Sequence, residues 1–530
     1  MKIPELLLLL VLIVLVVRQL PASRFAALGT WGRGPTLPIS AGILAATITL
    51  WQWGGFRAHP VVYDESAYLL QAELLASGHW SRPSPLVSEA FAQSAVLVTP
   101  VLAPKMLPGH AALLALGVLA HLPGLVPVLL VGLTAVLLAI LVRRLAGAGT
   151  ACIAVTLWLT QAGQARWRGS YFSENTTTWL WLLGWWSLLR WRERGKASWL
   201  LLLAAVTGWG AITRPLTMIA FVIPVGVVVI RDTIRSGRWG QLGSAIVVGV
   251  AFLMIIPLQN NAILGKWNRT PLGLYTRQYL PFDKIGFGYD STPPLLRQLP
   301  VFERGYVGFV ARHREHQPDA LPRVLFERLK QGAVTDFGWS RRFLVPIAVL
   351  GVLVLPAAGW LGVATASLLY ALYLGYAHPA SWTVYYAEAT PVTAAVIAIG
   401  LGWLIGVAVG SGDRTGWARG LVSLAILYSG APGLTEAREE NQEAQRPFRE
   451  FDQQVAAAIP TGRAIVFLRY APRHNPHVSF HRNVADPEVT RVLTALDLGT
   501  TQRAAVGRAY PDRRPYLWDE ASGRITADAP

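Results

Sequence analysis

Long apolar runs dominate this chain and limit what it can fold into. Twelve of them approach or reach the length that spans a bilayer, and only 15% of the 530 residues are charged. Soluble domains carry about 25% charged residues, and a spanning helix needs about 20 apolar ones. We therefore predict a polytopic α-helical membrane protein with about 11–13 transmembrane helices. The runs are 3–20, 36–54, 123–142, 149–165, 174–190, 198–213, 215–230, 241–258, 343–358, 360–377, 387–409 and 417–431.

The net charge of +17 is confined to the part of the chain that holds these runs. From Thr435 to the end, 13 arginines balance 13 acidic residues. Much of the basic excess falls in five short loops, which the positive-inside rule places in the cytoplasm. This location argues against nucleic-acid binding. The loops hold Arg18, Arg24 and Arg33; Arg143 and Arg144; Arg190, Arg192, Arg194 and Lys196; Arg231, Arg235 and Arg238; and Arg414 and Arg419.

This topology divides the chain into three predicted parts. Residues 1–35 form an N-terminal anchor helix and a cytoplasmic loop. Residues 36–431 form the transmembrane domain that carries the chemistry, with outer loops at 55–122 and 259–342. Residues 432–530 form a small extracytoplasmic domain. An acidic or basic excess is absent from that last part, as expected for a region governed by folding and not by membrane orientation.

The first apolar run has two interpretations. A lysine precedes residues 3–20 and small residues follow them, which is typical of a signal peptide. Arg18, Arg24 and Arg33 instead suit a cytoplasmic loop, and this favours an anchor that is retained.

The C-terminal part has the pattern of a small α/β domain. A charged amphipathic stretch covers 436–459, and the apolar run 464–468 predicts a buried strand. We predict a helix over 486–496 and a second short strand over 516–518.

Two adjacent carboxylates, Asp64 and Glu65, follow the second apolar run. Acidic side chains are costly near lipid, so such a pair at a membrane exit indicates chemistry. A partly desolvated carboxylate has a raised pKa, which suits a general base. The alternative is that Asp64 only caps a helix. Tyr68 lies one helical turn after Asp64 on the same face, as a substrate contact.

Basic side chains on the outer side are candidate phosphate ligands. Lys105 lies in a turn rich in proline and glycine, where it either holds a phosphate or extends to the interface as an ordinary lysine. His110 is a phosphate contact or a loop histidine. Arg214, between two spans, must pair with an anion, either a lipid-linked phosphate or the carboxylate of Glu174. Arg277 lies in a basic and aromatic stretch that suits sugar and phosphate binding or, equally, an ordinary interfacial belt.

A second aromatic group opens the span at 387–409. His378, Tyr385 and Tyr386 either contact a head group or form an interfacial belt. The chain has no Walker phosphate loop and no His-Glu-x-x-His motif, and its single cysteine, Cys152, allows no intrachain disulfide. These features exclude a P-loop ATPase and a zincin protease, and the low charge of the spans disfavours an ion-coupled transporter.

The order of these motifs resembles that of the GT-C membrane glycosyltransferases, which include protein O-mannosyltransferases, aminoarabinose transferases and arabinofuranosyltransferases. The resemblance covers about residues 36–410 and is strongest at 60–145. Leu107 and Tyr385 depart from the family pattern, where proline and arginine are frequent. The motifs are the acidic loop, a Lys-x-x-Pro-Gly turn from Lys105 to Gly109, Ser173-Glu174, Thr213-Arg-Pro215, a long outer loop and Tyr385-Tyr386.

The resemblance implies a GT-C-like fold and an inverting transfer of a sugar from a polyprenyl-phosphate donor to a hydroxyl of a glycan, lipid or protein. It implies that Asp64 is the base and that Lys105 contacts the donor phosphate. From the residues themselves we further predict that Glu65 assists the base and that Arg214 and Arg277 are phosphate contacts. The site then faces the periplasmic side of the inner membrane. No cofactor is certain, although Asp64 and Glu65 would be the ligands if a divalent ion were used. The alternatives are a lipid or polysaccharide translocator, a polymer ligase, or a non-catalytic assembly subunit.

Overall fold

The computed structural model describes residues 3–19, 34–283, 285–288, 303–338, 341–410, 412–475 and 477–527. The chain forms two compact units, and each is assembled from three separate stretches. The helical unit comprises residues 1–56, 127–252 and 319–441, and the mixed unit comprises residues 57–126, 253–318 and 442–530.

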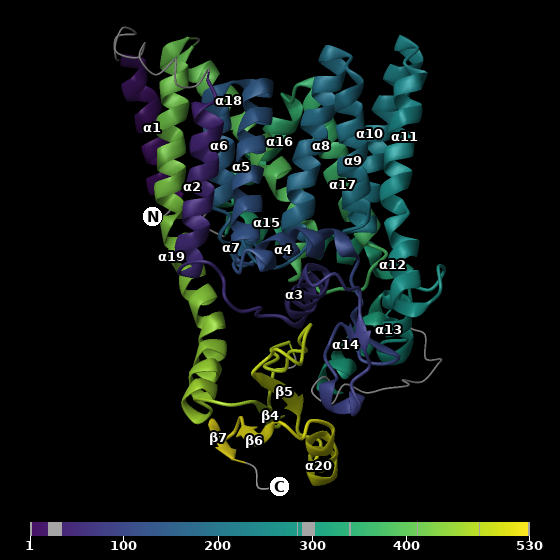
Figure 1. Cartoon of the computed structure of the whole chain (residues 1–530). Coiled ribbons are helices and arrows are strands. Elements are labelled where there is room, and N and C mark those ends of the chain that lie inside the picture. The colour runs from purple at the N-terminus through teal and green to yellow at the C-terminus, as the bar shows by residue number, and fades with distance from the viewer. Residues whose placement is uncertain are drawn as a thin grey trace. The chain divides into compact units, whose positions relative to one another are not determined.

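The helical unit is built from apolar helices that pack in pairs (Figure 1). Helix α8 packs on α9, α18 packs on α6 and α16, and α10 packs on α17. The expected run 3–20 forms α1, while Arg24 and Arg33 lie outside the described residues. The helices are α1 (Ile3–Gln19), α2 (Thr36–Trp53), α5 (Leu125–Ala146), α6 (Ala148–Leu159), α7 (Ala162–Ala165), α8 (Glu174–Arg194), α9 (Ala197–Ala211), α10 (Pro215–Ser236), α11 (Trp239–Leu253), α15 (Leu321–Phe337), α16 (Leu344–Leu353), α17 (Trp360–Tyr373), α18 (Thr390–Val409) and α19 (Asp413–Ala458).

Some of these helices are both long enough and apolar enough to cross a membrane. In the described part of the chain, four helical stretches are long and apolar enough to cross a membrane, and a pair bent by 116° makes a fifth if it counts as one span. The multi-pass helical class is confirmed. Several of the expected apolar runs form helices of 10–17 residues, because hydropathy does not show where a helix stops. The spans are Leu125–Ala146, Pro215–Ser236, Trp239–Leu264, Thr383–Val409 and the bent pair Leu344–Leu353 with Ala357–Tyr373.

Helices α16 and α18 approach closely because glycines face each other at their crossing. A methyl group on Gly400 would lie 2.5 Å from the carbonyl oxygen of Ile347 and 3.1 Å from the Cα of Gly351. A methyl group on Gly351 would clash with the carbonyl oxygen of Val396. Small residues that let helix backbones approach are the usual basis of packing in membranes.

We expect Gly351→Ala to lower the free energy of unfolding by about 1–3 kcal/mol, because the added methyl group overpacks this crossing. The measurement is thermal unfolding in detergent, followed by tryptophan fluorescence. Gly226→Ala in α10 is the matched control, since a methyl group there meets no atom within 4 Å. An equal loss in both variants would contradict the close-packing account.

The mixed unit combines short helices with two small sheets. In the first sheet, β3 (Val101–Pro104) pairs antiparallel with β1 (Arg82–Pro83) and β2 (Val96–Leu97). The second sheet, in the C-terminal tail, has the order β5-β4-β6-β7. The helices are α3 (Tyr63–Ala76), α4 (Pro108–Leu119), α12 (Ile255–Leu264), α13 (Pro271–Tyr279), α14 (Glu303–Glu315) and α20 (Thr500–Ala509), and the four tail strands are β4 (Ala464–Arg469), β5 (Val492–Leu496), β6 (Arg514–Asp519) and β7 (Arg524–Ala527).

The tail confirms most of the local predictions and corrects one. The expected strands 464–468 and 516–518 are present as β4 and β6, which pair in parallel. The helix expected over 486–496 is wrong, because 492–496 form β5, parallel to β4. A five-residue apolar run has no decisive period, and pairing with a distant strand settled its conformation. The amphipathic stretch from 436 is the second half of α19, which ends at Ala458.

His481 gives the tail a pH-dependent stability. Its Nδ1 lies 3.2 Å from the Oγ1 of Thr494, and its backbone amide donates to the hydroxyl of Tyr470 at 3.1 Å. The side chain is buried, and burial lowers its pKa to about 4. The ordinary value is about 6.5, so the neutral form is favoured in the fold.

We expect the protein to lose stability as the pH falls from 6.5 towards 4, because the unfolded chain binds the proton first. The contribution of His481 to the free energy of unfolding is fully present above pH 6.5. It falls by an amount on the order of 3 kcal/mol as the pH drops from 6.5 to 4. Thermal unfolding at pH 7.5 and at pH 4.5 measures it. His481→Asn should flatten the difference between the two values, and the exposed His79→Asn should not. Identical pH profiles in all three proteins would refute the role of His481.

Candidate active site

The acidic pair lies in the first turn of α3, where the helix dipole favours carboxylates. Glu65 is fully buried, and its Oε2 accepts hydrogen bonds from Arg57 Nη2 at 2.6 Å, from the Val61 amide at 2.8 Å and from the Val62 amide at 3.1 Å. One oxygen therefore fixes the preceding loop to the start of the helix. Asp64, the preceding residue, is half-buried.

Lys105 is held at the end of β3. Its ammonium nitrogen lies 4.8 Å from the centre of the Tyr275 ring, an arrangement that attracts a cation to an aromatic face. The hydroxyl of Tyr275 accepts a hydrogen bond from the Ala95 amide at 2.9 Å. The turn is held to α3 by a hydrogen bond that the side-chain amide of Gln71 donates to the carbonyl of Met106 at 2.9 Å. Lys105 thus occupies a defined, half-buried position.

His110 and Tyr68 join the two helices that carry the acid and the lysine turn. His110 is fully buried, and its ring meets that of Tyr68 edge to face with 4.9 Å between centroids. Helix α3 packs on α4. The structure therefore brings Asp64, Glu65, Tyr68, Lys105 and His110 onto neighbouring elements of the mixed unit. Arg277 belongs to the same unit but is exposed, on the face of α13 opposite the buried Tyr275.

The C-terminal tail also contacts α3 within the mixed unit. The rings of Tyr63 and His477 stack with 5.7 Å between centroids, next to Asp64 in sequence. Burial lowers the pKa of His477, so this ring is favoured in its neutral form. Further along α3, Arg482 and Glu73 form an ion pair at 3.1 Å. Sequence analysis did not link the tail to the acidic pair, because nothing local signals contacts over 400 residues.

One carboxylate of the acidic pair is already paired with a cation. Glu65 is the second candidate ligand, and its buried carboxylate already accepts three hydrogen bonds through one oxygen, one of them from the cation of Arg57. In the part of the chain that the structure describes, no group of three or more His, Cys, Asp or Glu side chains is placed to hold a metal ion.

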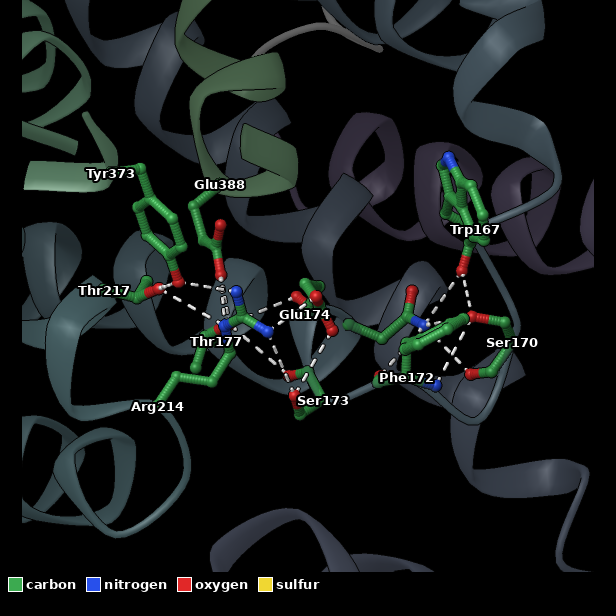
Figure 2. Close-up of polar contacts among 11 residues, drawn as sticks. Trp167, Ser170, Phe172, Ser173, Glu174, Thr177, Arg214, Thr217, Tyr373 and Glu388 are labelled. Atoms are coloured by element: carbon green, nitrogen blue, oxygen red, sulfur yellow. Dashed lines mark hydrogen bonds and ion pairs between the residues drawn. The ribbon is translucent and has the colours of Figure 1, made fainter. Parts of the chain in front are cut away.

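A second polar cluster surrounds Arg214 in the helical unit (Figure 2). Arg214 Nη1 lies 2.6 Å from Glu174 Oε1, and its Nε lies 3.8 Å from Glu388 Oε1. Its Nη2 donates to the hydroxyl of Tyr373 at 2.7 Å, and its Nε donates to the Oγ1 of Thr217 at 3.2 Å. Of the two partners left open by the sequence, the structure has Arg214 paired with Glu174.

Glu388 is a member of this cluster that sequence analysis did not assign. Its side chain is fully buried at the start of the span Thr383–Val409, and Oε1 accepts a hydrogen bond from Thr177. The signal was present, because an acid at the start of an apolar run is rare unless it has a partner. That partner, Arg214, lies 174 residues earlier and only the tertiary structure reveals it.

The aromatic group expected near the span forms one cluster. His378 Nε2 lies 3.1 Å from the Tyr386 hydroxyl, and the Tyr386 ring stacks on Tyr370 with 4.0 Å between centroids. The Tyr385 ring lies 5.6 Å from the guanidinium carbon of Arg214, which connects the aromatic and polar clusters. Arg328 was not foreseen: it donates to the carbonyl of Tyr373 at 2.6 Å and holds the end of α17.

The predicted site residues therefore divide between the two units. Asp64, Glu65, Tyr68, Lys105, His110 and Arg277 belong to the mixed unit, and Glu174, Arg214, His378, Tyr385 and Tyr386 belong to the helical unit.

Comparison with solved structures identifies the fold. The chain is similar to ArnT from Cupriavidus metallidurans bound to undecaprenyl phosphate, with a TM-score of 0.52 and 13% identity over 94% of this chain and 91% of that chain. The chain has a GT-C-like fold. ArnT from the same organism in the apo state matches with a TM-score of 0.49 and 14% identity over 83% of each chain. No family model and no curated protein matches the sequence.

We expect Arg57→Met to lower the free energy of unfolding by about 3–5 kcal/mol, because it leaves the buried carboxylate of Glu65 without its cation. Denaturant unfolding in detergent measures the change. Arg446→Met is the control, since the ion pair of Arg446 with Glu443 is exposed and contributes less than about 1 kcal/mol. A loss at Arg57 no larger than at Arg446 would show that the buried pair does not stabilise this loop.

Proposed function

We propose that this protein is a membrane glycosyltransferase that moves a sugar from a polyprenyl-phosphate donor to an acceptor hydroxyl with inversion. The observation that carries the proposal is the placement of a carboxylate in the first turn of α3 and a lysine in the turn before α4, on helices that pack together. The GT-C-like fold supports it, since the ArnT structure with that fold was solved with undecaprenyl phosphate.

In the proposed reaction, Asp64 accepts the proton of the acceptor hydroxyl. The hydroxyl oxygen attacks the anomeric carbon from the face opposite the phosphate, and the bond from that carbon to the phosphate oxygen breaks. The polyprenyl phosphate leaves with the electron pair. Lys105 offsets the charge that develops on the departing phosphate, where a fixed cation lowers the barrier most.

Glu65 has a different role in this scheme from Asp64. Its buried oxygen is occupied by Arg57 and two backbone amides, so a proton from substrate would displace those hydrogen bonds. We therefore assign Glu65 as a positioning residue that fixes the turn from which Asp64 projects. His110 has a similar supporting role, since it is buried against Tyr68.

The cations are also unequal as phosphate ligands. Arg214 already lies between the two carboxylates of Glu174 and Glu388, so its charge is compensated and an added anion would meet repulsion. Lys105 contacts an aromatic ring through its ammonium group, and Arg277 is exposed. We assign the donor phosphate to Lys105, and we assign Arg214 to holding Tyr373 and Tyr385 beside Glu174.

A lipid-linked donor explains why such an enzyme is a multi-pass membrane protein. The polyprenyl chain does not leave the bilayer, so the reacting phosphate stays at the membrane surface. The basic loops between the apolar runs favour an extracytoplasmic position for Asp64. We propose the inner membrane as the location, with the reaction on the periplasmic face.

We expect Asp64→Asn to lower sugar transfer by about 10²–10⁴-fold, because the amide does not accept the proton. The assay incubates the purified protein with a panel of short-chain polyprenyl-phosphate monosaccharides and a membrane extract as acceptor. Mass spectrometry quantifies the polyprenyl phosphate that is released.

Glu89→Gln serves as the control in that assay, because Glu89 is an exposed carboxylate of the same unit. Both variants should unfold at the wild-type temperature. Unchanged release by Asp64→Asn would remove Asp64 as the base. Absence of release by the wild-type protein with every donor in the panel would count against the glycosyltransferase itself and favour a translocator or an assembly subunit.

A further inference from the structure

A basic cavity lies in the helical unit where α5, α8 and α10 end. Its volume is about 580 Å³, within the range of small-molecule sites. The three helices pack through α8 on α10 and through their shared apolar core (Figure 1). The charged residues of the lining are Arg144, Arg192, Glu193, Asp232, Arg235 and Arg238.

The two carboxylates of this cavity are already shared among several arginines. Glu193 pairs with Arg144 and lies 3.5 Å from Arg190, while Asp232 lies 2.7 Å from Arg192. Within the described ranges, no ion pair involves Arg235 or Arg238. The lining thus holds four arginines against two acids, and the adjoining sequence 186–200 adds Arg190, Arg194 and Lys196 without another carboxylate.

Helix dipoles do not account for this charge. A helix C-terminus carries about half a negative charge, so the ends of α5, α8 and α10 together offset less than two arginines. The positive charge of the cavity lining, together with Arg190, Arg194 and Lys196 beside it, exceeds what these three helix ends offset. Arg238 is also half-buried, with its guanidinium carbon 5.9 Å from the ring of the fully buried Trp191. The ring contact uses the face of the Arg238 guanidinium, so its N–H groups can still donate hydrogen bonds to an anion.

An apolar cavity of about 70 Å³ adjoins the basic one. The two share Leu145, Leu189 and Ala358 in their linings, and the apolar cavity continues between α5, α8 and α18. A charged recess that passes into an apolar one matches an amphiphile, with a phosphate at the helix ends and a hydrocarbon chain alongside the helices. Basic pockets between membrane helices are suited to anionic lipid head groups.

We propose that this cavity binds the phosphate of an anionic phospholipid, at a site separate from the chemistry assigned to Asp64. Arg235 and Arg238 donate to the phosphate oxygens, and Arg144 and Arg192 remain paired with the two acids. The shared ligand chemistry is a phosphate group, so a soluble phosphate is the second source that the experiment must distinguish.

The experiment titrates the detergent-solubilised protein with phosphatidylglycerol and, separately, with phosphatidylcholine, and measures binding by native mass spectrometry. Wild type should bind phosphatidylglycerol more tightly. The double variant Arg235→Gln/Arg238→Gln should raise the dissociation constant for phosphatidylglycerol by roughly 10- to 30-fold. The reason is that each arginine near an anionic head group strengthens binding by roughly 3- to 5-fold, and the double variant removes two of them. Arg194→Gln is the control, since Arg194 is an exposed arginine at the end of α8 that does not line the cavity.

Each outcome is decisive. Weaker binding only in the double variant supports the lipid site. Displacement of phosphatidylglycerol by inorganic phosphate at an equal concentration, again only with both arginines present, supports the phosphate site but assigns it to a soluble ligand. Equal affinity for the two lipids, or an equal loss in Arg194→Gln, overturns the proposal and leaves these arginines as determinants of membrane orientation.

Discussion

An ionised side chain that leaves water needs a partner, and this requirement organises the polar parts of both units. In the mixed unit, Arg57 and Glu65 meet at 2.6 Å in a fully buried pair that fixes the start of α3. In the helical unit, Arg214 lies between Glu174 and Glu388 and connects α8, α10 and the start of the last span. The apolar helices supply the surrounding low-polarity medium, in which an unpaired charge would cost several kcal/mol.

This constraint also identifies residues whose charge is committed to holding the structure. Glu65 and Arg214 are committed to partners, although their residue types and positions suggested direct roles. Asp64 and Lys105 lie on a helix and a turn of the mixed unit that hydrogen bonds and ring contacts hold in place. A positioned reactive group supported by a neighbouring hydrogen-bonded group is the arrangement that catalysis requires.

Local sequence patterns predicted the elements better than their extents. The apolar runs and the positive-inside rule were enough for a multi-pass helical protein, and the strands at 464–468 and 516–518 followed from β-forming runs. The ends of several helices and the strand at 492–496 did not follow. Helix termination inside an apolar run depends on packing, and a five-residue run takes the conformation that its distant partner strand imposes.

The sequence by itself determined the chemistry that this chain has available: an acidic pair after the second apolar run, a lysine in a rigid turn, an arginine between spans and aromatic side chains at a span entrance. Only the tertiary structure decided which of these groups neutralise one another. The physical reason is that charge pairing acts through space over a few ångströms, and the pairs involving Arg214 join residues 40 and 174 positions apart. A sequence pattern does not show which residues so far apart in the chain come within a few ångströms of one another in the fold.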